Sequence, residues 1–301
     1  MKKALLIVNP NSGKKEGRAL SNHVMSHLAE SFGSVDVRVS SCATDVESWA
    51  REARERECDA VFVMGGDGTV GLSLRGLFEG ALEGERMPAF GLIPDGTGNG
   101  LARTLGIVPD ALRAVESYDF SRTVPFDIGT VNGRPFAYTV TGGTLPEGIR
   151  EVSPELKSRY GFLAYVASTI LRMGNDEHHA LRIVVDGKEW EEDFSSFSAF
   201  SANALVNEFA LHQTSVSDGE IHLIALRNAS LPSLLSILPD IVTRAIDGDD
   251  QVLFVHGKTI EVSCVDGDLR CGVDGDGGPC LPVKLGVRPG ALRMFALKGD
   301  L

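Results

Sequence analysis

The sequence predicts an α/β domain with a mainly parallel sheet, followed by a β-rich domain of the sandwich type. Through about residue 118, short apolar runs alternate with helical patterns, which is typical of a parallel sheet covered by helices on both faces. From about residue 124, short strand-like runs separated by turn residues dominate, which is typical of an antiparallel sandwich or barrel. We expect a first domain over residues 1–123 and a second over residues 124–289.

Four runs in the first domain predict strands. Three of them are short, continuous and apolar, as expected for strands with both faces covered, and the run 35–39 alternates. The predicted strands are residues 4–8, 35–39, 60–64 and 89–93. The predicted helices run from Ser12 to about Phe32, from Thr44 or Asp45 to about Glu57, from Thr69 to about Phe78, and onward from near Leu101.

The second domain is expected to consist of short strands and two helical inserts. The predicted strands are residues 135–141, 181–185, 196–204, 220–226, 252–255, 259–264, 269–273 and 292–297. The helical inserts are expected at about 159–173 and 231–246. The insert 159–173 is apolar on most sides, and it either covers the core or lines a lipid cleft and touches a bilayer.

Composition narrows the range of partners. The net charge is −12 and no run concentrates Lys and Arg, which argues against a duplex nucleic-acid partner and a permanent electrostatic membrane anchor. No stretch reaches the roughly 18 apolar residues that span a bilayer, so we expect a soluble protein. An acidic chain suits a metal-assisted phosphate site, because Mg²⁺ prefers carboxylate ligands.

The cysteines and histidines do not predict a metal site. The five cysteines are Cys42, Cys58, Cys264, Cys271 and Cys280. They form no CxxC pair and no metal-ligand spacing with histidine, and their odd number and wide spacing predict reduced thiols in a cytoplasm. Adjacent side chains on a loop diverge, so we interpret His178 and His179 as exposed polar residues.

The loops after the first, third and fourth predicted strands are all suited to bind anions. They are residues 9–15, 65–69 and 95–100, and they offer glycines, hydroxyl groups and helix N-termini. In an open α/β sheet such loops lie at the carboxyl edge of the strands, where ligands bind. The pattern GxxxxGK[ST] is absent, and so is GxGxxG after the first strand, so a different mode of nucleotide binding is expected.

Three motifs together resemble the diacylglycerol kinase catalytic-domain family. They are Asn9-Pro10-x-Ser12-Gly13, Gly65-Gly66-Asp67-Gly68-Thr69 and Pro94-x-Gly96-Thr97-Gly98-Asn99-Gly100-Leu101-Ala102. That family includes bacterial diacylglycerol kinase-like, sphingosine and ceramide kinases, and the resemblance extends more loosely over nearly the whole chain. It implies a nucleotide domain like that of NAD kinase and phosphofructokinase and a β-rich lipid-binding domain. It also implies that residues 290–301 return to the first domain.

The resemblance also implies roles for individual residues. It places ATP contacts at Asn9, Pro10, Ser12, Gly13, Ser40, Gly65, Gly66, Asp67, Gly68, Thr69, Gly96, Thr97 and Asn99. Asp67 would also hold Mg²⁺ through water, and Asp218, which precedes Gly219, would belong to a structural Mg²⁺ site. Asp276 would accept the proton of the substrate hydroxyl, where the family usually has a glutamate. From the residues alone, Asp218 and Asp276 could equally be turn residues.

The resemblance is weaker in the second domain. Residues 138–143, 207–209 and 212–214 depart from the pattern of the family and leave the acceptor open. The leading interpretation is a cytoplasmic kinase that uses ATP and Mg²⁺ to phosphorylate a lipid alcohol, such as diacylglycerol or a sphingoid base. It would contact the inner membrane surface transiently and bind no nucleic acid. The sequence leaves the oligomeric state open, with a homodimer as one option.

Two alternatives remain open. An NAD kinase-like phosphotransferase would share the Gly65–Thr69 loop, although Gly100 follows Asn99 where NAD kinases carry an Asn-Glu pair after their second loop. A nucleotide- or lipid-binding regulator without catalysis would fit the altered motifs of the second domain, whereas the intact loops of the first domain speak against it.

Overall fold

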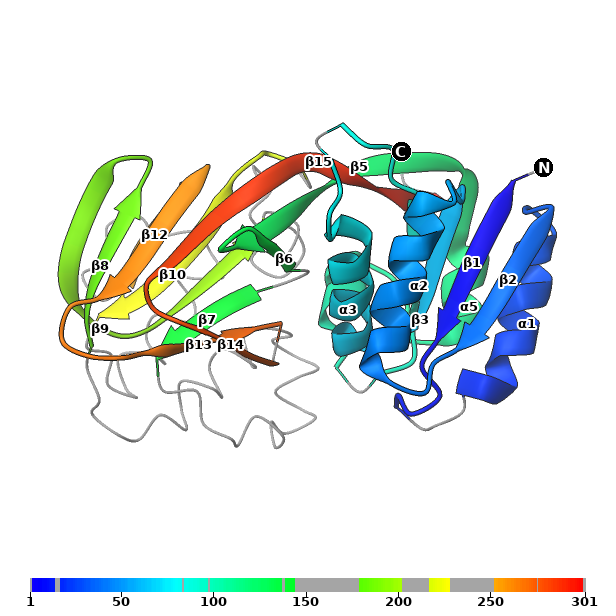
Figure 1. Ribbon diagram of the computed structural model, residues 1–301, viewed down its shortest axis with the longest axis horizontal. Coiled ribbons are helices and arrows are strands. Elements are labelled where there is room, and N and C mark those ends of the chain that lie inside the picture. Colours follow the sequence, from blue (N-terminus) through cyan, green and yellow to red (C-terminus); the bar gives the residue numbers. More distant parts are fainter. Residues whose placement is uncertain are drawn as a thin grey trace. The chain divides into compact units, whose positions relative to one another are not determined.

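The computed structural model contains two compact units (Figure 1). It describes residues 2–13, 17–82, 84–96, 98–136, 139–143, 179–201, 217–227, 252–274 and 276–299. The first unit comprises Met1–Ile128, Arg134–Ala137 and Arg288–Leu301, and the second comprises Gly129–Gly133 and Tyr138–Val287. Two long strands, β5 (Tyr118–Val131) and β15 (Val283–Leu297), contribute residues to both units.

The first unit contains a parallel sheet with the strand order β4-β3-β1-β2. The strands are β1 (Lys3–Val8), β2 (Ser34–Val39), β3 (Ala60–Gly65) and β4 (Ala89–Pro94). Residues 4–8 and 60–65 are buried throughout, which explains why these runs are continuously apolar. β15 extends the sheet beyond β4 through the parallel pair Met294 and Phe90. The structure thus confirms the predicted α/β fold of this unit.

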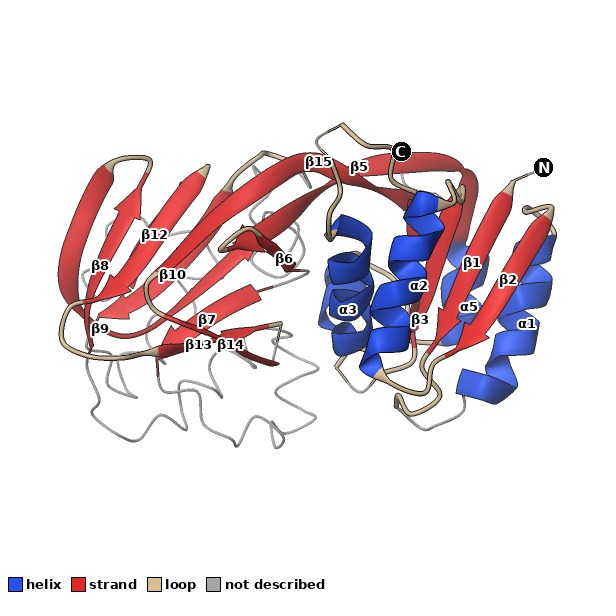
Figure 2. Cartoon of the chain, viewed as in Figure 1, coloured by secondary structure: helices blue, strands red, loops and turns tan. Residues whose placement is uncertain are grey.

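Helices cover both faces of this sheet (Figure 2), with α2 and α3 on one face and α1 and α5 on the other. The helices are α1 (Gly17–Ala29), α2 (Ala43–Glu55), α3 (Asp67–Phe78), α4 (Gly100–Thr104) and α5 (Ala111–Ser117). The approach of α2 to α3 is close at Gly76, where an added Cβ would lie 2.1 Å from the carbonyl oxygen of Glu47. Any larger residue at this position would therefore push the two helices apart.

The first two helices begin at positions other than those expected. α1 starts at Gly17 rather than Ser12, and the preceding Gly13 has the left-handed φ of +48°, which a right-handed helix does not accept. α2 has Cys42 as its N-cap rather than Thr44 or Asp45. Asp45 instead lies in the first turn and accepts hydrogen bonds from the amides of Ser41 and Cys42 at 2.7 and 3.2 Å. Its carboxylate satisfies free amides from inside the helix, as in a capping box.

An aromatic cluster joins the C-terminal strand to the core of the first unit. The Phe295 ring of β15 stacks on the Phe62 ring of β3, with centroids 5.2 Å apart. Phe32, Tyr118 and Phe120 surround this pair with tilted or edge-on rings. The Tyr118 hydroxyl donates to the carbonyl oxygen of Leu92 at 2.7 Å, and burial raises the pKa of this hydroxyl. The cluster therefore combines apolar packing with a fully paired polar group.

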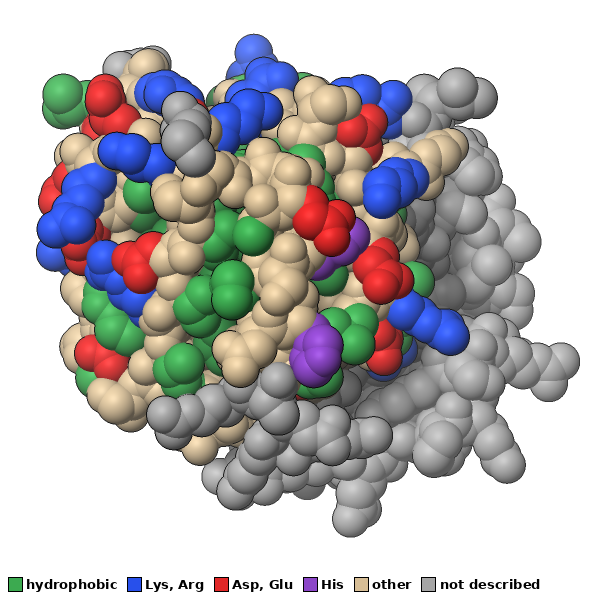
Figure 3. Space-filling model, turned by 90° about the vertical axis from the view of Figure 1, so that its right-hand side faces the viewer, with side chains coloured by type: hydrophobic (Ala, Val, Ile, Leu, Met, Phe, Trp, Pro, Cys, Tyr) green, Lys and Arg blue, Asp and Glu red, His purple; other side chains and the backbone are tan. Residues whose placement is uncertain are grey.

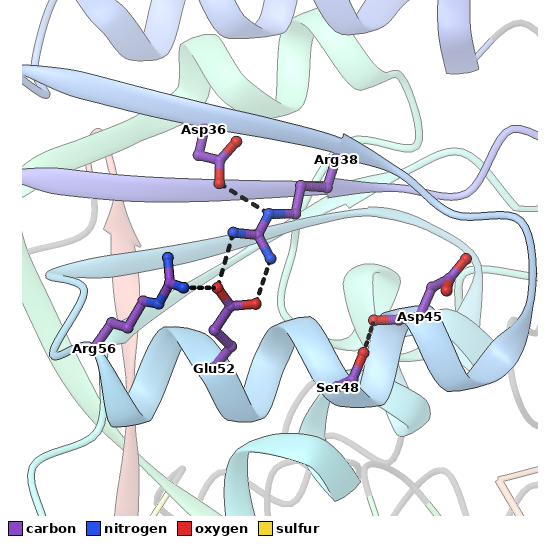
Figure 4. Close-up of polar contacts among 6 residues, drawn as sticks. All are labelled: Asp36, Arg38, Asp45, Ser48, Glu52 and Arg56. Carbon is purple, nitrogen blue, oxygen red and sulfur yellow. Dashed lines mark hydrogen bonds and ion pairs between the residues drawn. The ribbon is translucent and has the colours of Figure 1, made fainter.

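An ion-pair network ties the edge strand β2 to α2 (Figure 4). Arg38 donates to Asp36 on its own strand at 2.8 Å and forms a bidentate pair with Glu52 of α2 at 2.6 and 3.2 Å. Arg56 contacts the same carboxylate at 2.8 Å. The hydrogen bond from Arg38 lowers the pKa of the Glu52 carboxyl below its ordinary value of 4.5. Because Glu52 is 29% exposed, solvent screens this network and limits its contribution to stability.

The second unit is built from antiparallel strand pairs in the order β14-β13-β7-β9-β8-β12, and β10 joins β9 to β11. Its strands include β7 (Thr139–Gly143), β8 (His179–Val185), β9 (Lys188–Ser201), β10 (Ile221–Arg227), β11 (Val252–Gly257), β12 (Thr259–Cys264), β13 (Arg270–Val273) and β14 (Asp276–Cys280). Asp186 and Gly187 form a tight turn between β8 and β9 with positive φ at both positions. Such turns match the right-handed twist of the strands that they connect.

Several predictions for the second half of the chain need correction. β5 escaped prediction because its first half is polar and partly exposed, and β14 because its residues are typical of turns. The single strand expected over 135–141 corresponds to β6 (Arg134–Phe136) and β7. The run 292–297 is only the end of β15. The helical inserts expected at 159–173 and 231–246 lie outside the described residues, as do residues 207–209 and 212–214.

Two further features concern the length of the helices and the charge of the surface. Among the described residues, no helix is long and apolar enough to cross a membrane. On the face of the first unit that Figure 3 shows, Lys and Arg side chains are interspersed with Asp and Glu.

Candidate functional site

The first loop of the predicted site follows β1 and is tied to the second loop by Asn9. The Asn9 amide donates to the Met64 carbonyl at 2.9 Å and so continues the pairing of β1 with β3. The Asn9 side-chain nitrogen donates to the Thr69 hydroxyl at 2.9 Å, and its side-chain oxygen accepts from the Asn11 amide at 3.0 Å. Asn9 therefore organises its own loop while it holds the first turn of α3.

Ser12 and Gly13 tie the first loop to the third. The Ser12 hydroxyl lies 2.8 Å from the Asn9 carbonyl oxygen and 3.1 Å from a carboxylate oxygen of Asp95. At Gly13, an added Cβ would lie only 2.2 Å from the Asp95 carbonyl oxygen. The backbones of the two loops are therefore in contact, and only glycine fits between them. Pro10, which precedes them, forms part of the same turn.

Asp67 joins the second loop to the third. It is the first residue of α3, it is half-buried, and Gly66 is the N-cap of that helix. One carboxylate oxygen accepts from the Gly100 amide at 3.0 Å and the other from the Leu101 amide at 3.2 Å. Both amides open the short helix α4, so the carboxylate of one loop fixes the start of the helix that follows the next loop.

The glycines at the same place let the backbones of the second and third loops touch. An added Cβ on Gly96 would lie 2.4 Å from the Gly66 Cα and 2.7 Å from the Asn99 side-chain oxygen. Asn99 has a left-handed backbone, and its side chain both accepts from the Gly96 amide and donates to the Gly96 carbonyl. Gly65 is equally close-packed against Thr69, whereas an added Cβ on Gly68 would meet no atom within 4 Å. Gly68 thus stands at the open side of the loop.

Two of the predicted nucleotide-binding residues, Ser40 and Thr97, remain to be placed. Ser40 follows β2, and its amide and its hydroxyl both donate to the Val8 carbonyl, at 2.8 and 3.2 Å. Ser40 is buried, with an exposed fraction of 7%, and its hydroxyl is used in this hydrogen bond at the edge of the sheet. Thr97 lies outside the described residues. A small cavity between the second and third loops is lined by Gly65, Gly66, Asp67, Pro94, Asn99 and Ala102.

Asp95 belongs to the site, although the motifs did not predict a role for it. Its carboxylate accepts from Ser12, and its amide donates to the Gly65 carbonyl at 3.0 Å, so it contacts both other loops. The signal that could have found it is its position directly after β4, where polar side chains of parallel strands converge. The motifs predicted its partner Ser12 as a site residue, but they did not predict that Asp95 joins the loops.

In the second unit, Asp218 lies in a turn beside a buried histidine. One carboxylate oxygen accepts from the Glu220 amide at 3.0 Å, and the other lies 3.0 Å from His222 Nε2. His222 is only 2% exposed, and its ring lies beside those of Phe254 and His256, with centroids 6.0 and 5.5 Å away. This carboxylate therefore holds the turn that precedes β10 (Ile221–Arg227) to the buried ring of His222.

Asp276 is the first residue of β14, and its side chain is exposed. It faces Val273 across the β13–β14 hairpin, and the described residues give its carboxylate no hydrogen bond or ion pair. Asp274, two residues earlier, has a positive φ, and its carboxylate accepts from the Thr139 amide at 3.0 Å. Asp274 thus fixes the hairpin to β7, and Asp276 is left available to solvent or substrate.

Comparisons with known proteins agree across the whole chain. A model described as diacylglycerol kinase catalytic domain matches residues 3–131, and one described as YegS C-terminal NAD kinase beta sandwich-like domain matches residues 148–296. The chain is 30% identical over 296 residues to a protein of Streptococcus pneumoniae named "Putative lipid kinase", covering 98% of both chains. It is 29% identical to a diacylglycerol kinase of Bacillus subtilis, covering 94% of this chain and 92% of that one.

A solved structure shares the fold. The crystal structure of a "putative diacylglycerol kinase" from Bacillus anthracis matches all of this chain and 99% of its own, with a TM-score of 0.79 and 22% identity. At that identity the likeness concerns the fold. Together with the match to the YegS C-terminal NAD kinase beta sandwich-like domain, this structure confirms the predicted combination of an α/β unit and a β-rich unit.

Proposed function

Since the chain belongs to the diacylglycerol kinase catalytic-domain family, we propose that it transfers the γ-phosphate of ATP to the hydroxyl group of a lipid alcohol. The observation that carries this proposal is the set of three loops that Asn9, Ser12 and Asp67 hold together at one edge of the parallel sheet. Diacylglycerol is the acceptor to test first, because a relative of similar length is named diacylglycerol kinase. Sphingoid bases, which the resemblance of the motifs also implies, come next.

The glycine-rich loops suit the phosphates of ATP. The first amides of α3 have no partner within that helix, and a helix N-terminus attracts anions through these amides and the helix dipole. The open space at Gly68 leaves room for a phosphate against the backbone, whereas Gly65, Gly66 and Gly96 are used to pack the loops. The loops would thus meet the phosphates without a change in their backbone contacts.

Asp67 is proposed to hold Mg²⁺ through water. An ionised carboxylate offers about four lone-pair sites, and two of those of Asp67 are used by the amides of Gly100 and Leu101. The remaining sites fit a hydrated Mg²⁺, which would neutralise charge on the transferring phosphoryl group. The two amides keep the carboxylate in one orientation, so it does not have to be ordered when the metal binds.

Two residues of the second unit are proposed by family position. Asp276 would accept the proton of the lipid hydroxyl, and its exposed carboxylate fits that role. Asp218 would contribute to a structural Mg²⁺ site and would share its oxygens with the Glu220 amide and His222. We further propose a cytoplasmic protein that contacts the membrane surface transiently to reach its lipid, without a nucleic-acid partner.

A labelled-phosphate assay tests the proposal. Purified protein would be incubated with labelled ATP, Mg²⁺ and a panel of diacylglycerol, sphingosine, ceramide and NAD. We expect label in a lipid, and we expect Asp67→Asn to lower the rate by about 10²–10³-fold, as the loss of a charge-positioning group does. Asp268→Asn, which changes an exposed aspartate without a recorded partner among the described residues, is the matched control.

The same panel separates the alternatives. Label that appears only in NAD would replace the proposal with an NAD kinase-like activity. ATP binding without turnover on any acceptor would replace it with a regulatory role.

A further inference from the structure

A separate group of side chains meets at one end of the sheet in the second unit. β8 and β12 are antiparallel neighbours, and their last register pair joins Leu181 to Cys264. His179 lies two residues before Leu181, so it points to the same face as the buried residues of β8. Cys264 points to that face too, because it continues the alternation of the buried Ile260 and Val262. The topology therefore sets an imidazole beside a thiol.

Asp266 completes the group from the turn after β12. The Val265 amide donates to the Ala180 carbonyl at 2.8 Å, and the Ala180 amide contacts the Asp266 carboxylate at 3.3 Å. The Cys264 thiol lies 3.1 Å from the other oxygen of the same carboxylate. One ligand atom each from His179, Cys264 and Asp266 lie within 4.8 Å of one another. No other group of three such residues occurs among the residues that the structure describes.

His179 also has a ring nitrogen without a partner in the described part of the chain. Its Nε2 is inaccessible to solvent and has no hydrogen-bond partner among the described residues. A buried polar atom without a partner costs free energy, and natural structures contain few of them. A bound ligand that pairs with this nitrogen would remove the cost.

We propose that His179, Cys264 and Asp266 bind a zinc ion, with water as the fourth ligand. Imidazole, thiolate and carboxylate are the three ligand types of zinc sites, whereas Mg²⁺ prefers oxygen ligands alone. A neutral imidazole, a thiolate and a carboxylate carry two negative charges, which balance Zn²⁺. The thiol proton leaves to solvent as the zinc–sulfur bond forms.

The geometry requires only a small local closure. Zinc bonds of about 2.0–2.3 Å in a tetrahedral site place ligand atoms roughly 3.3–3.8 Å apart. From separations of up to 4.8 Å, side-chain rotations and a shift of about 1 Å would complete the site. The ion would then join the start of β8 to the turn after β12, within the second unit.

This site was not visible in the sequence. The cysteines have no metal-ligand spacing with histidine along the chain, and His179 was interpreted as an exposed polar residue. The structure corrects that interpretation, because His179 is half-buried at the beginning of a strand. Antiparallel pairing brings together residues that are far apart in sequence.

Zinc titration of the full chain tests the proposal. The protein would be stripped with a chelator, kept reduced and titrated with zinc against a chromophoric competitor. We expect one zinc per chain that Cys264→Ser and His179→Gln each weaken by at least about 100-fold. Asp266→Asn should weaken zinc binding as well. The matched controls Cys280→Ser, at an exposed cysteine, and Asp268→Asn, at an exposed aspartate, should bind zinc as the unaltered protein does.

Cobalt substitution provides a readout that does not depend on the variants' folding. Co²⁺ in the unaltered protein should give a thiolate-to-metal charge-transfer band in the near ultraviolet and the visible bands of tetrahedral cobalt. The absence of that charge-transfer band would overturn the proposal, and so would zinc binding that survives both Cys264→Ser and His179→Gln. Because metal content is measured without ATP or lipid, a failure here leaves the proposed kinase activity intact, and the reverse also holds.

Discussion

The three loops of the first unit and the acidic residues of the second unit differ in how they are held. In the first unit, the side chain of Asn9 joins the first loop to the second, Ser12 joins the first to the third, and Asp67 joins the second to the third, so every loop of the site is tied to the other two. In the second unit, Asp218 precedes β10 and Asp276 opens β14, and the carboxylate of Asp276 makes no hydrogen bond or ion pair with the described residues. Under the proposed function, the interlocked loops would bind the phosphates of ATP, and Asp276 would act on the acceptor.

The largest expected effect concerns Asp276. If this residue accepts the proton of the lipid hydroxyl, Asp276→Asn should lower kcat by about 10²–10⁴-fold and leave KM for ATP unchanged. Its exposed side chain predicts no change in melting temperature. Steady-state kinetics with the best lipid from the panel, beside a thermal unfolding scan, measure both quantities.

The neighbouring Asp274 sharpens this comparison. Because its carboxylate accepts from the Thr139 amide, Asp274→Asn should change stability more than Asp276→Asn does. A fully active Asp276→Asn variant would leave the second unit without its proposed catalytic residue.

A pair of glycines tests the claim that the loops of the first unit pack on one another. Gly96→Ala places a Cβ 2.4 Å from the Gly66 Cα, so we expect a loss of about 1–3 kcal/mol in the free energy of unfolding even without nucleotide. Gly68→Ala meets no atom, and it lies in a helix, so it should leave stability equal or slightly higher.

The affinity for ATP provides a second comparison of the two glycine variants. Urea unfolding gives the stabilities, and calorimetric titration gives the nucleotide affinity. We expect Gly68→Ala to weaken ATP binding despite its intact fold. Equal stability of both variants would contradict the close packing of the loops.

The smallest expected effect concerns the ion pairs of α2, which involve no side chain of the three loops. The Arg38 hydrogen bond lowers the folded-state pKa of Glu52 below 4.5, so its stabilisation is present above that pH and is lost as pH falls through the folded value. Glu52→Gln should cost about 0.5–1 kcal/mol at pH 7, and the difference should vanish in acid. Melting temperatures between pH 7 and pH 3 check this, with the exposed Glu116→Gln as control.

Sequence patterns predicted the first unit well, for a physical reason. Strands such as β1 and β3 are buried on both faces, so their apolar runs are continuous and easy to find. Parallel strands also deliver their following loops to one edge, so motifs far apart in the chain could be assigned to one site before the contacts were known. The contacts themselves, such as Asp67 with the start of α4, could not be predicted because they depend on loop conformation.

The second unit was harder to predict. β14 is composed of turn-forming residues, and its pairing with β13 comes from the hairpin that Asp274 fixes rather than from strand propensity. The neighbourhood of His179, Cys264 and Asp266 depends on the register of β8 against β12, which residue spacing along the chain does not encode. The hydrogen bond from the Ser40 hydroxyl to the Val8 carbonyl likewise depends on a backbone arrangement that residue spacing does not encode.

The stacking of Phe295 on Phe62 has a consequence for the order of synthesis. Phe62 lies in the first unit, yet its ring partner is made only after the ribosome has translated Tyr138–Val287 of the second unit. A nascent chain that stops short of Phe295 leaves the Phe62 ring without that partner. We expect the first unit to be more sensitive to protease in a released chain that ends at residue 287 than in a released chain that includes residue 299. The first unit, whose synthesis begins first, would thus be completed after the second unit.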